Sequence, residues 1–291
     1  MIDAIAMLLQ ADPAAPAETA ALPAWQVAAV AVSALAATAA VWRFRLLRPA
    51  QEPAGRLPRD PALGALAMLG FLVAGMLGVT AGASLCAAFG VSDEAWSRLV
   101  RGSCANAVQV AIVLPLIASA LFVAAPRPRA RARRALAEGV LGIALAAPIV
   151  VAAAMALQLA LQALGMPPAP DVSHETLGIL RAKNDALFTA LTLAQTALLV
   201  PLAEEAAWRG LMQPAMRRAG LPALASVVAT AVLFAAVHWS VIAPEGRITA
   251  MAMLTLLGIA FGILRERTGG ILAPAVAHGL FNAANVGLAM A

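Results

Sequence analysis

Two adjacent carboxylates and an arginine follow a long apolar run in the second half of the sequence. The run Ala186–Ala203 holds no charged residue, and Glu204, Glu205 and Arg209 come after it. Glu205 and Arg209 are four residues apart, so on a helix they share one face and can pair. Glu204 points about 100° away from Glu205, which predicts that it faces a cavity. Acids are costly inside a bilayer and mark candidate functional sites there, although both could instead mark the helix end in the headgroup region.

A histidine in the next apolar run can reach the level of Glu204. The segment Arg217–Pro222 predicts a helix end and a turn. Glu204 and His238 each lie about sixteen residues from that turn, and at about 1.5 Å per residue they reach a similar height in an antiparallel hairpin. Phe234 is four residues before His238 and shares its face. We therefore expect Glu204 beside His238, with an aromatic wall next to the imidazole.

A second hairpin supplies another histidine and a carboxamide. Residues 265–270 predict a turn, and His278 lies about 12 Å beyond it along a helix. Asn282 follows four residues later and shares the face of His278. A carboxylate, two imidazoles and a carboxamide are therefore expected to converge from three helices.

These residue types suit hydrolysis by an activated water molecule. A glutamate can take a proton from water, a neighbouring histidine can hold that water, and a second histidine with an asparagine can donate to an oxyanion. Glu204, His238 and His278 could alternatively bind zinc with water in the fourth position. The sequence lacks a His-Glu-x-x-His motif, which favours direct catalysis without a cofactor.

Composition places the chain in the membrane. Of its 291 residues 62% are hydrophobic and only 12% are charged, about half the charge of a typical soluble domain. Mean hydropathy is +0.86. The net charge of +5 comes from bases in the loops between apolar runs, which is the pattern of topology signals and not of a nucleic-acid-binding surface.

About eight apolar runs have the length that a membrane helix requires. Their Ala, Leu and Val content favours helices over the short alternating strands of a membrane barrel. The sequence therefore predicts an all-α polytopic membrane protein of about eight transmembrane helices. The runs are Ala24–Trp42, Pro61–Ala83, Cys104–Ala125, Leu136–Leu164, Ala186–Ala203, Pro222–Trp239, Ile248–Leu264 and Gly270–Met290.

Arginines collect in alternate loops, and cytoplasmic loops are the ones enriched in positive charge. We expect a multi-pass protein of the cell membrane with both termini outside and with Glu204 near the cytoplasmic side. The N-terminal tail is acidic, with Asp3, Asp12 and Glu18. The loops predicted to be cytoplasmic hold Arg43, Arg45, Arg48, Arg56 and Arg59, then Arg127, Arg129, Arg131, Arg133 and Arg134, then Arg217 and Arg218, then Arg265 and Arg267.

The chain changes character near Asn184. Residues 1–184 hold four predicted helices with Arg-rich loops, and residues 185–291 hold the four helices with the ionisable groups. Cys86 and Cys104 flank a loop predicted to be outside, where a disulfide could form in an oxidising compartment; two unpaired thiols are favoured. His174 lies in a polar loop and is expected to be solvated.

The C-terminal part of the sequence resembles a family of intramembrane proteases. The segment Glu204–Arg209 matches the motif Glu-Glu-x-x-x-Arg, Phe234–His238 matches Phe-x-x-x-His, and His278–Asn282 matches His-x-x-x-Asn. The approach Arg267–Pro274 is similar as well. These motifs occur in this order in the CPBP family, which includes the type II CAAX prenyl endopeptidases, and the resemblance covers about residues 185–286.

The resemblance implies an eight-helix membrane fold with a conical cavity that opens to the cytosol. It implies an endopeptidase acting on a peptide or a lipidated protein within membrane lipid. The chain departs from many members at Ala206 and Ala207, where bulkier residues are common, which bears on substrate fit. By resemblance, Glu204 is the base on water, His238 its partner, His278 and Asn282 the oxyanion donors, and Glu205, Arg209 and Phe234 supporting residues.

Two other interpretations stay open at this point. The first is a scaffold or immunity-type protein that uses the same fold without turnover. The second is a small transporter with Glu204 as a proton carrier, which would more often show internal repeats and broken helices. The presence of Glu204, His238, His278 and Asn282 together favours the enzyme, because a scaffold needs no such set.

Overall fold

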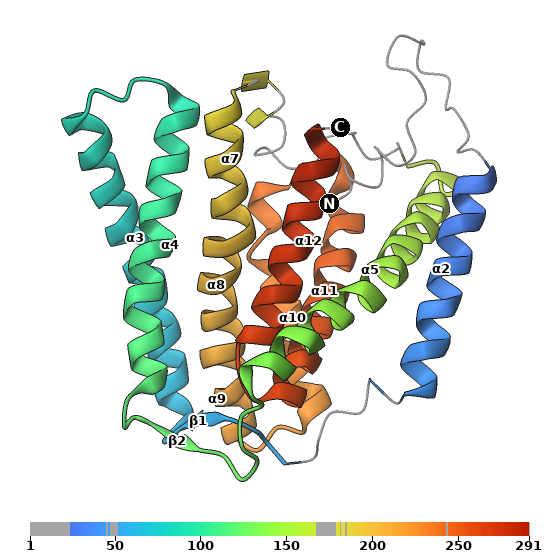
Figure 1. Ribbon diagram of the computed structural model, residues 1–291, viewed down its shortest axis with the longest axis horizontal. Helices are drawn as coiled ribbons and strands as arrows, with labels where there is room; N and C mark the ends of the chain where they lie inside the picture. Colours follow the sequence, from blue (N-terminus) through green and yellow to red (C-terminus); the bar gives the residue numbers. More distant parts are fainter. Residues whose placement is uncertain are drawn as a thin grey trace.

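The computed structural model describes residues 24–44, 46, 52–166, 179–180, 182–183, 185–242 and 244–290. Within them the chain is a helical bundle with one two-stranded sheet at its end (Figure 1). This confirms the predicted all-α polytopic class. The helices are α2 (Ala24–Arg43), α3 (Pro61–Ala88), α4 (Glu94–Ala118), α5 (Ala132–Ala163), α7 (Ala186–Ala194), α8 (Val200–Glu205), α9 (Gln213–Arg218), α10 (Ala223–Ala236), α11 (Arg247–Thr268) and α12 (Leu272–Met290).

Seven described helical segments are long and apolar enough to cross a bilayer. The eighth predicted span, Gly270–Met290, is helical as α12 but is not among those seven. Three polar residues, His278, Asn282 and Asn285, interrupt its apolar character. The helix α12, which carries His278, is therefore the least apolar of the eight segments.

The segment Ala186–Arg218 is one continuous helix, longer than the predicted run Ala186–Ala203. It contains two π-helical stretches, η1 (Gln195–Leu199) and η2 (Ala206–Met212), on either side of α8. Such stretches are rare and are often found at functional sites. Glu204 and Glu205 consequently lie inside the helix and not at its end.

The third predicted span, Cys104–Ala125, is wrong at both ends. The helix α4 begins ten residues earlier, because Asp93 caps it by accepting a hydrogen bond from the Trp96 amide. Outside the membrane, the hydrogen bond from Lys183 holds the pKa of the Asp93 carboxyl below its usual value. At the other end α4 stops at Ala118, and the apolar residues that follow form a strand.

The Arg-rich loops lie together at one end of the bundle. The strand β1 (Arg56–Pro58) lies in the Arg-rich segment between α2 and α3. It pairs antiparallel with β2 (Phe122–Ala124), which comes just before the Arg-rich segment that leads into α5. The Arg56 guanidinium donates to the carbonyls of Ser119 and Phe122, which ties the two segments together. The helix α2 begins, and α12 ends, at the opposite end (Figure 1). The chain therefore crosses the bundle an even number of times between the start of α2 and the end of α12.

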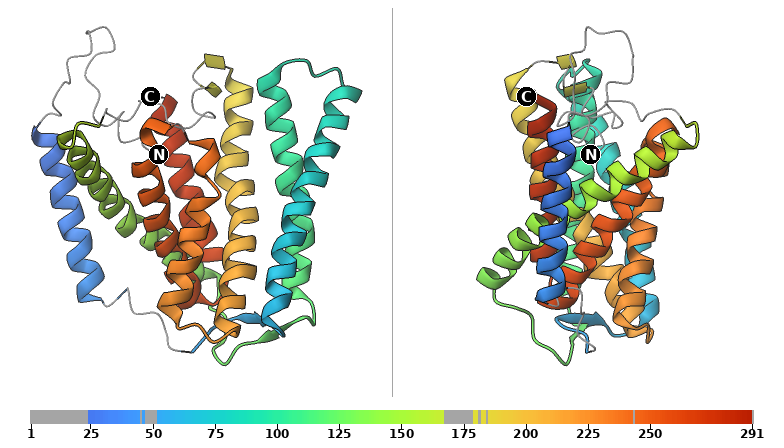
Figure 2. Two further views of the ribbon diagram at one scale, coloured as in Figure 1. Left: turned by 180° about the vertical axis from the view of Figure 1, so that it is seen from behind. Right: turned by 90° about the vertical axis from the view of Figure 1, so that its right-hand side faces the viewer.

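The helices form a central group with two flanking elements (Figure 2). The hairpin of α3 and α4 lies at one edge, α2 lies at the other, and α5 runs obliquely across the bundle. The long helix Ala186–Arg218 lies between the α3–α4 hairpin and the group α10, α11 and α12. It can therefore present its acids to α10 and α12 on one side.

Some predictions concern residues outside the described part of the chain. The acidic N-terminal tail, His174 and Ala291 fall there. Cys86 and Cys104 are described, and both are free thiols, as favoured from the sequence.

Candidate active site

Glu204 lies between two histidine rings. Its Oε1 is 3.8 Å from Nε2 of His238, and its Oε2 is 3.8 Å from Nε2 of His278. These separations are too long for direct hydrogen bonds and leave room for an atom that contacts both groups. The Glu204 side chain is 24% exposed and the His238 side chain 21%. The carboxylate is thus reachable, with one imidazole nitrogen facing each of its oxygens.

His238 stands just after α10, where the helix gives way to a short 3₁₀ turn. Its Nδ1 is 2.7 Å from the carbonyl oxygen of Phe234. A carbonyl only accepts, so Nδ1 carries the proton of the neutral ring. The unprotonated Nε2 therefore faces Glu204 and can accept a hydrogen bond from a water molecule there.

Glu205 and Arg209 form a fully buried ion pair, as the four-residue spacing predicts. Nη1 of Arg209 is 3.0 Å from Oε1 of Glu205, and neither side chain is exposed. Nη2 of Arg209 donates to the carbonyl of Gly258 on α11, at 2.9 Å. The guanidinium also lies over the rings of Phe234 and Phe261, at 4.9 and 5.5 Å. Arg209 thus joins its own helix to α10 and α11.

His278 connects the two acids. Its Nδ1 is 3.1 Å from Oε1 of Glu205, and because that carboxylate is paired with Arg209, Nδ1 acts as the donor. The ring stacks on Phe261 with 5.0 Å between centroids and meets the edge of Phe234. Only 7% of the residue is exposed. The position and the orientation of the imidazole are therefore both fixed by buried neighbours.

Asn282 lies one turn beyond His278 on α12. Its Nδ2 donates to the carbonyl of Thr196 in η1, at 2.9 Å. Gly279 allows this approach, because a Cβ there would lie 2.2 Å from the Ala197 carbonyl oxygen. The structure thus brings Glu204 within 3.8 Å of both His238 and His278 and places Asn282 against η1, one helical turn from His278.

With this geometry established, comparison with known proteins gives one positive result. A family model of type II CAAX prenyl endopeptidases, Rce1-like, matches residues 186–284. Residues 186–284 are an Rce1-like domain. The match begins at the first residue of α7 and includes every candidate site residue. No curated protein and no solved structure matches the chain.

The family match confirms the resemblance found in the three motifs. An Rce1-like domain is, at family level, a CAAX-type intramembrane peptidase that acts on a peptide or protein in the membrane. The apolar helices make the chain a multi-pass membrane protein. The departure from many members at Ala206 and Ala207 lies in η2, where both residues are fully buried against an apolar cluster that includes Phe71, Val113 and Phe234.

Sequence reasoning missed two residues that hold the candidate site together, Phe261 and Gly258. The stacking of His278 on Phe261 requires α11 to pass close to α12. The hydrogen bond from Arg209 requires that no side chain block its approach to the Gly258 carbonyl. The pair Gly258 and Gly262 was the available signal, since small residues four apart mark close helix approach in membranes. A Cβ at Gly258 would lie 2.9 Å from that of Ala231 on α10.

The described residues contain no group of three or more His, Cys, Asp or Glu side chains arranged to hold a metal ion. Both Nε2 atoms, of His238 and His278, face oxygens of the Glu204 carboxylate at 3.8 Å. Two atoms that bind the same zinc ion at about 2.0–2.2 Å lie about 3.4 Å from one another in a tetrahedral site, so these separations alone do not distinguish a zinc site from a water site.

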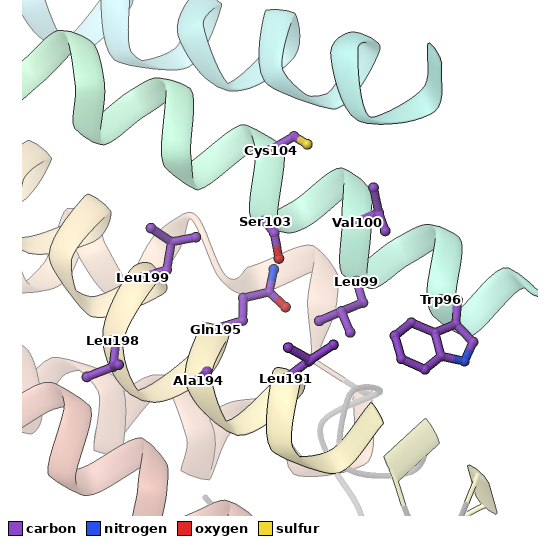
Figure 3. A pocket seen from close by; sticks show the side chains of 10 residues that line it. All are labelled: Trp96, Leu99, Val100, Ser103, Cys104, Leu191, Ala194, Gln195, Leu198 and Leu199. Atoms are coloured by element: carbon purple, nitrogen blue, oxygen red, sulfur yellow. The ribbon is translucent and has the colours of Figure 1, made fainter. Parts of the chain in front are cut away.

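A separate groove of about 460 Å³ lies between α4 and the α7–η1 part of the long helix (Figure 3). Its lining is mainly apolar, with Gln195 and Ser103 pointing toward one another across it. None of the Glu204, His238 and His278 side chains lines it. One side of η1 therefore borders this groove while another packs against α12.

Proposed function

We propose that this protein is an intramembrane endopeptidase in which Glu204 activates water for direct attack on a peptide bond. The observation that carries the proposal is the placement of one partly exposed carboxylate between two imidazoles, each orientated by its own Nδ1 contact. The substrate is a membrane-associated or lipidated peptide or protein. The site opens to the cytoplasmic side through a cavity, and both termini lie outside.

In the proposed reaction a water molecule lies between Glu204 and Nε2 of His238. At 3.8 Å apart, the two groups can both accept from one water at normal hydrogen-bond lengths. Glu204 takes a proton as the water oxygen attacks the scissile carbonyl carbon. The carbon–nitrogen bond then breaks, and the proton passes to the departing amine.

The developing oxyanion needs donors on the α12 side of the site. Asn282 has a second N–H besides the one bound to Thr196. His278 already uses Nδ1 toward Glu205, so donation from its Nε2 requires a doubly protonated ring. We assign the oxyanion contact to these two residues, with Glu205 and Arg209 supporting His278.

Quantitative proteomics of membrane peptides tests the proposal. Cells that produce the wild-type chain are compared with cells that produce Glu204→Ala at the same level in the membrane. We expect a set of membrane peptides to be cleaved only with the wild type. Identical peptide profiles in both cells would contradict the proposed function.

A further inference from the structure

The π-helical stretch η1 ends two residues before a proline, at Leu199. In η1 the amide of Val200 donates to the carbonyl of Gln195, five residues back. The next donor in that register would be residue 201, and its acceptor would be Thr196. Residue 201 is Pro201, which has no N–H. The Thr196 carbonyl is consequently left without the backbone partner that this register would supply.

A side chain from α12 takes the place of the missing donor. Nδ2 of Asn282 lies 2.9 Å from the Thr196 oxygen. In this apolar region an unpaired carbonyl is costly, so the carbonyl and the carboxamide stabilise each other. Gly279 lets α12 come close enough for the contact.

The same arrangement occurs a second time in the long helix. In η2 the Gln213 amide donates to Trp208, five residues back. The next donor would be Pro214, and its acceptor would be the carbonyl of Arg209. That carbonyl accepts instead from Nε of Arg265 on α11, at 2.8 Å. In both cases a proline in the π register frees a carbonyl that a neighbouring helix then binds.

We propose that Pro201 is a positioning residue for the reaction, acting through the Thr196 carbonyl on Asn282. Because Pro201 offers no amide hydrogen, Thr196 binds one N–H of Asn282 and fixes the carboxamide. The other N–H is then held ready for the oxyanion. This inference rests on the proposed function, since it deepens the assignment of Asn282 as a donor.

The contact itself can be tested without any activity. The sequence contains four asparagines, so selective ¹⁵N-asparagine labelling gives four side-chain amide signals, and Asn282→Ala identifies the one of interest. We expect the Asn282 signal to be protected from exchange with D₂O in the wild type. Pro201→Ala restores an amide that competes for Thr196, so the protection should fall by at least tenfold. Pro115→Ala restores an amide inside α4 and should leave the signal unchanged.

Kinetics then test the consequence for turnover. We expect Pro201→Ala to lower kcat by about tenfold or more with little change in KM, and to have no further effect in an Asn282→Ala background. Pro115→Ala should keep wild-type kinetics. An exchange rate and a kcat equal to those of the wild type in Pro201→Ala would overturn the inference, as would fully additive losses in the double variant.

A backbone ester separates the missing hydrogen from the stiffness of the proline ring. Lactic acid at position 201, introduced by nonsense suppression, lacks both the ring and the N–H. We expect it to restore the Asn282 protection and kcat relative to Pro201→Ala, whereas failure to restore either would contradict the inference. If the wild type cleaves no peptide while the exchange results hold, the proposed function fails and the positioning contact stands.

Discussion

At the residue scale, the two adjacent glutamates have different surroundings although their side chains are identical. Glu205 is fully buried and its Oε1 serves both Arg209 and His278. Glu204 is partly exposed and faces imidazole nitrogens without a direct hydrogen bond. One glutamate is therefore suited to hold the site together and the other to react with a bound molecule.

Replacing each glutamate by glutamine should separate these roles. We expect Glu204→Gln to abolish turnover while the protein keeps its yield and its melting temperature. Glu205→Gln leaves the Arg209 guanidinium buried without its counter-ion, and breaking such a pair costs about 3–5 kcal/mol. Thermal unfolding in detergent should show a clear loss for Glu205→Gln. A stable, fully active Glu204→Gln protein would refute the assignment of the base.

His278 should matter for turnover as an oxyanion donor. Removing one such donor usually lowers kcat by about 10²–10³, and we expect this loss for His278→Ala. His174→Ala, in the polar stretch of sequence before the Rce1-like domain, is the matched control and should behave as the wild type. Equal kcat values for His278→Ala and wild type would assign the oxyanion contact elsewhere.

Metal content distinguishes direct catalysis from the zinc alternative. If Glu204, His238 and His278 bound zinc, the removal of any one would lower the metal content, and a chelator would silence the enzyme reversibly. We expect purified active protein to hold well under one metal ion per chain, measured by mass spectrometry. Stoichiometric zinc, with activity removed by chelation and restored by zinc alone, would decide for the metal.

At the element scale, the sequence predicted two of the contacts in the candidate site but not what fixes their geometry. The four-residue spacing of Glu205 and Arg209 predicted their ion pair, and equal distance from the turn at Arg217–Pro222 predicted the contact of Glu204 with His238. The π stretches depend on a register that residue periodicity does not encode. The contact of His278 with Glu205 depends on the orientation of the His278 imidazole. That orientation is set only when α12 packs against α8 and α11.

Two helix boundaries show why charge was misleading as a boundary signal. The sequence predicts a loop between Cys86 and Cys104, yet Glu94 pairs with Arg98 and Arg101 along the first turns of α4. It also predicts a span that ends at Ala203, before the acids at 204 and 205, whereas burial and pairing let the helix continue to Arg218. In both cases a glutamate that pairs with an arginine of the same helix does not mark the end of that helix.

The close passage of α11 and α10 makes a sharp prediction for Gly258. A methyl group there would meet Ala231 at 2.9 Å and the Arg209 guanidinium at 3.4 Å, and such overpacking costs about 1–3 kcal/mol. We expect Gly258→Ala to lower both the melting temperature and kcat. Gly70→Ala, in α3 with nothing within 4 Å of the new Cβ, should be neutral or stabilising. An unchanged melting temperature in Gly258→Ala would contradict this packing account.

At the scale of the whole molecule, the arginine asymmetry and the fold together predict an orientation. The segment 126–131, between β2 and α5, lies at the end of the bundle that holds the Arg-rich segments, and α12 ends at the other end. A reporter fused within 126–135 should report the cytoplasm, and one fused after Ala291 should report the outside. Both reporters on the same side would mean an even number of crossings between them in place of the expected five, and the helix count would then be wrong.

The account's central claim is that Glu204 drives attack by water on a peptide bond inside the membrane. The most direct measurement uses H₂¹⁸O, purified protein in liposomes, and a membrane peptide cleaved in wild-type but not in Glu204→Ala cells. Mass spectrometry of the products should show one ¹⁸O in the new carboxyl terminus with the wild type and no cleavage with Glu204→Gln. Cleavage by Glu204→Gln at the wild-type rate, or no cleavage by the wild type, would contradict the claim.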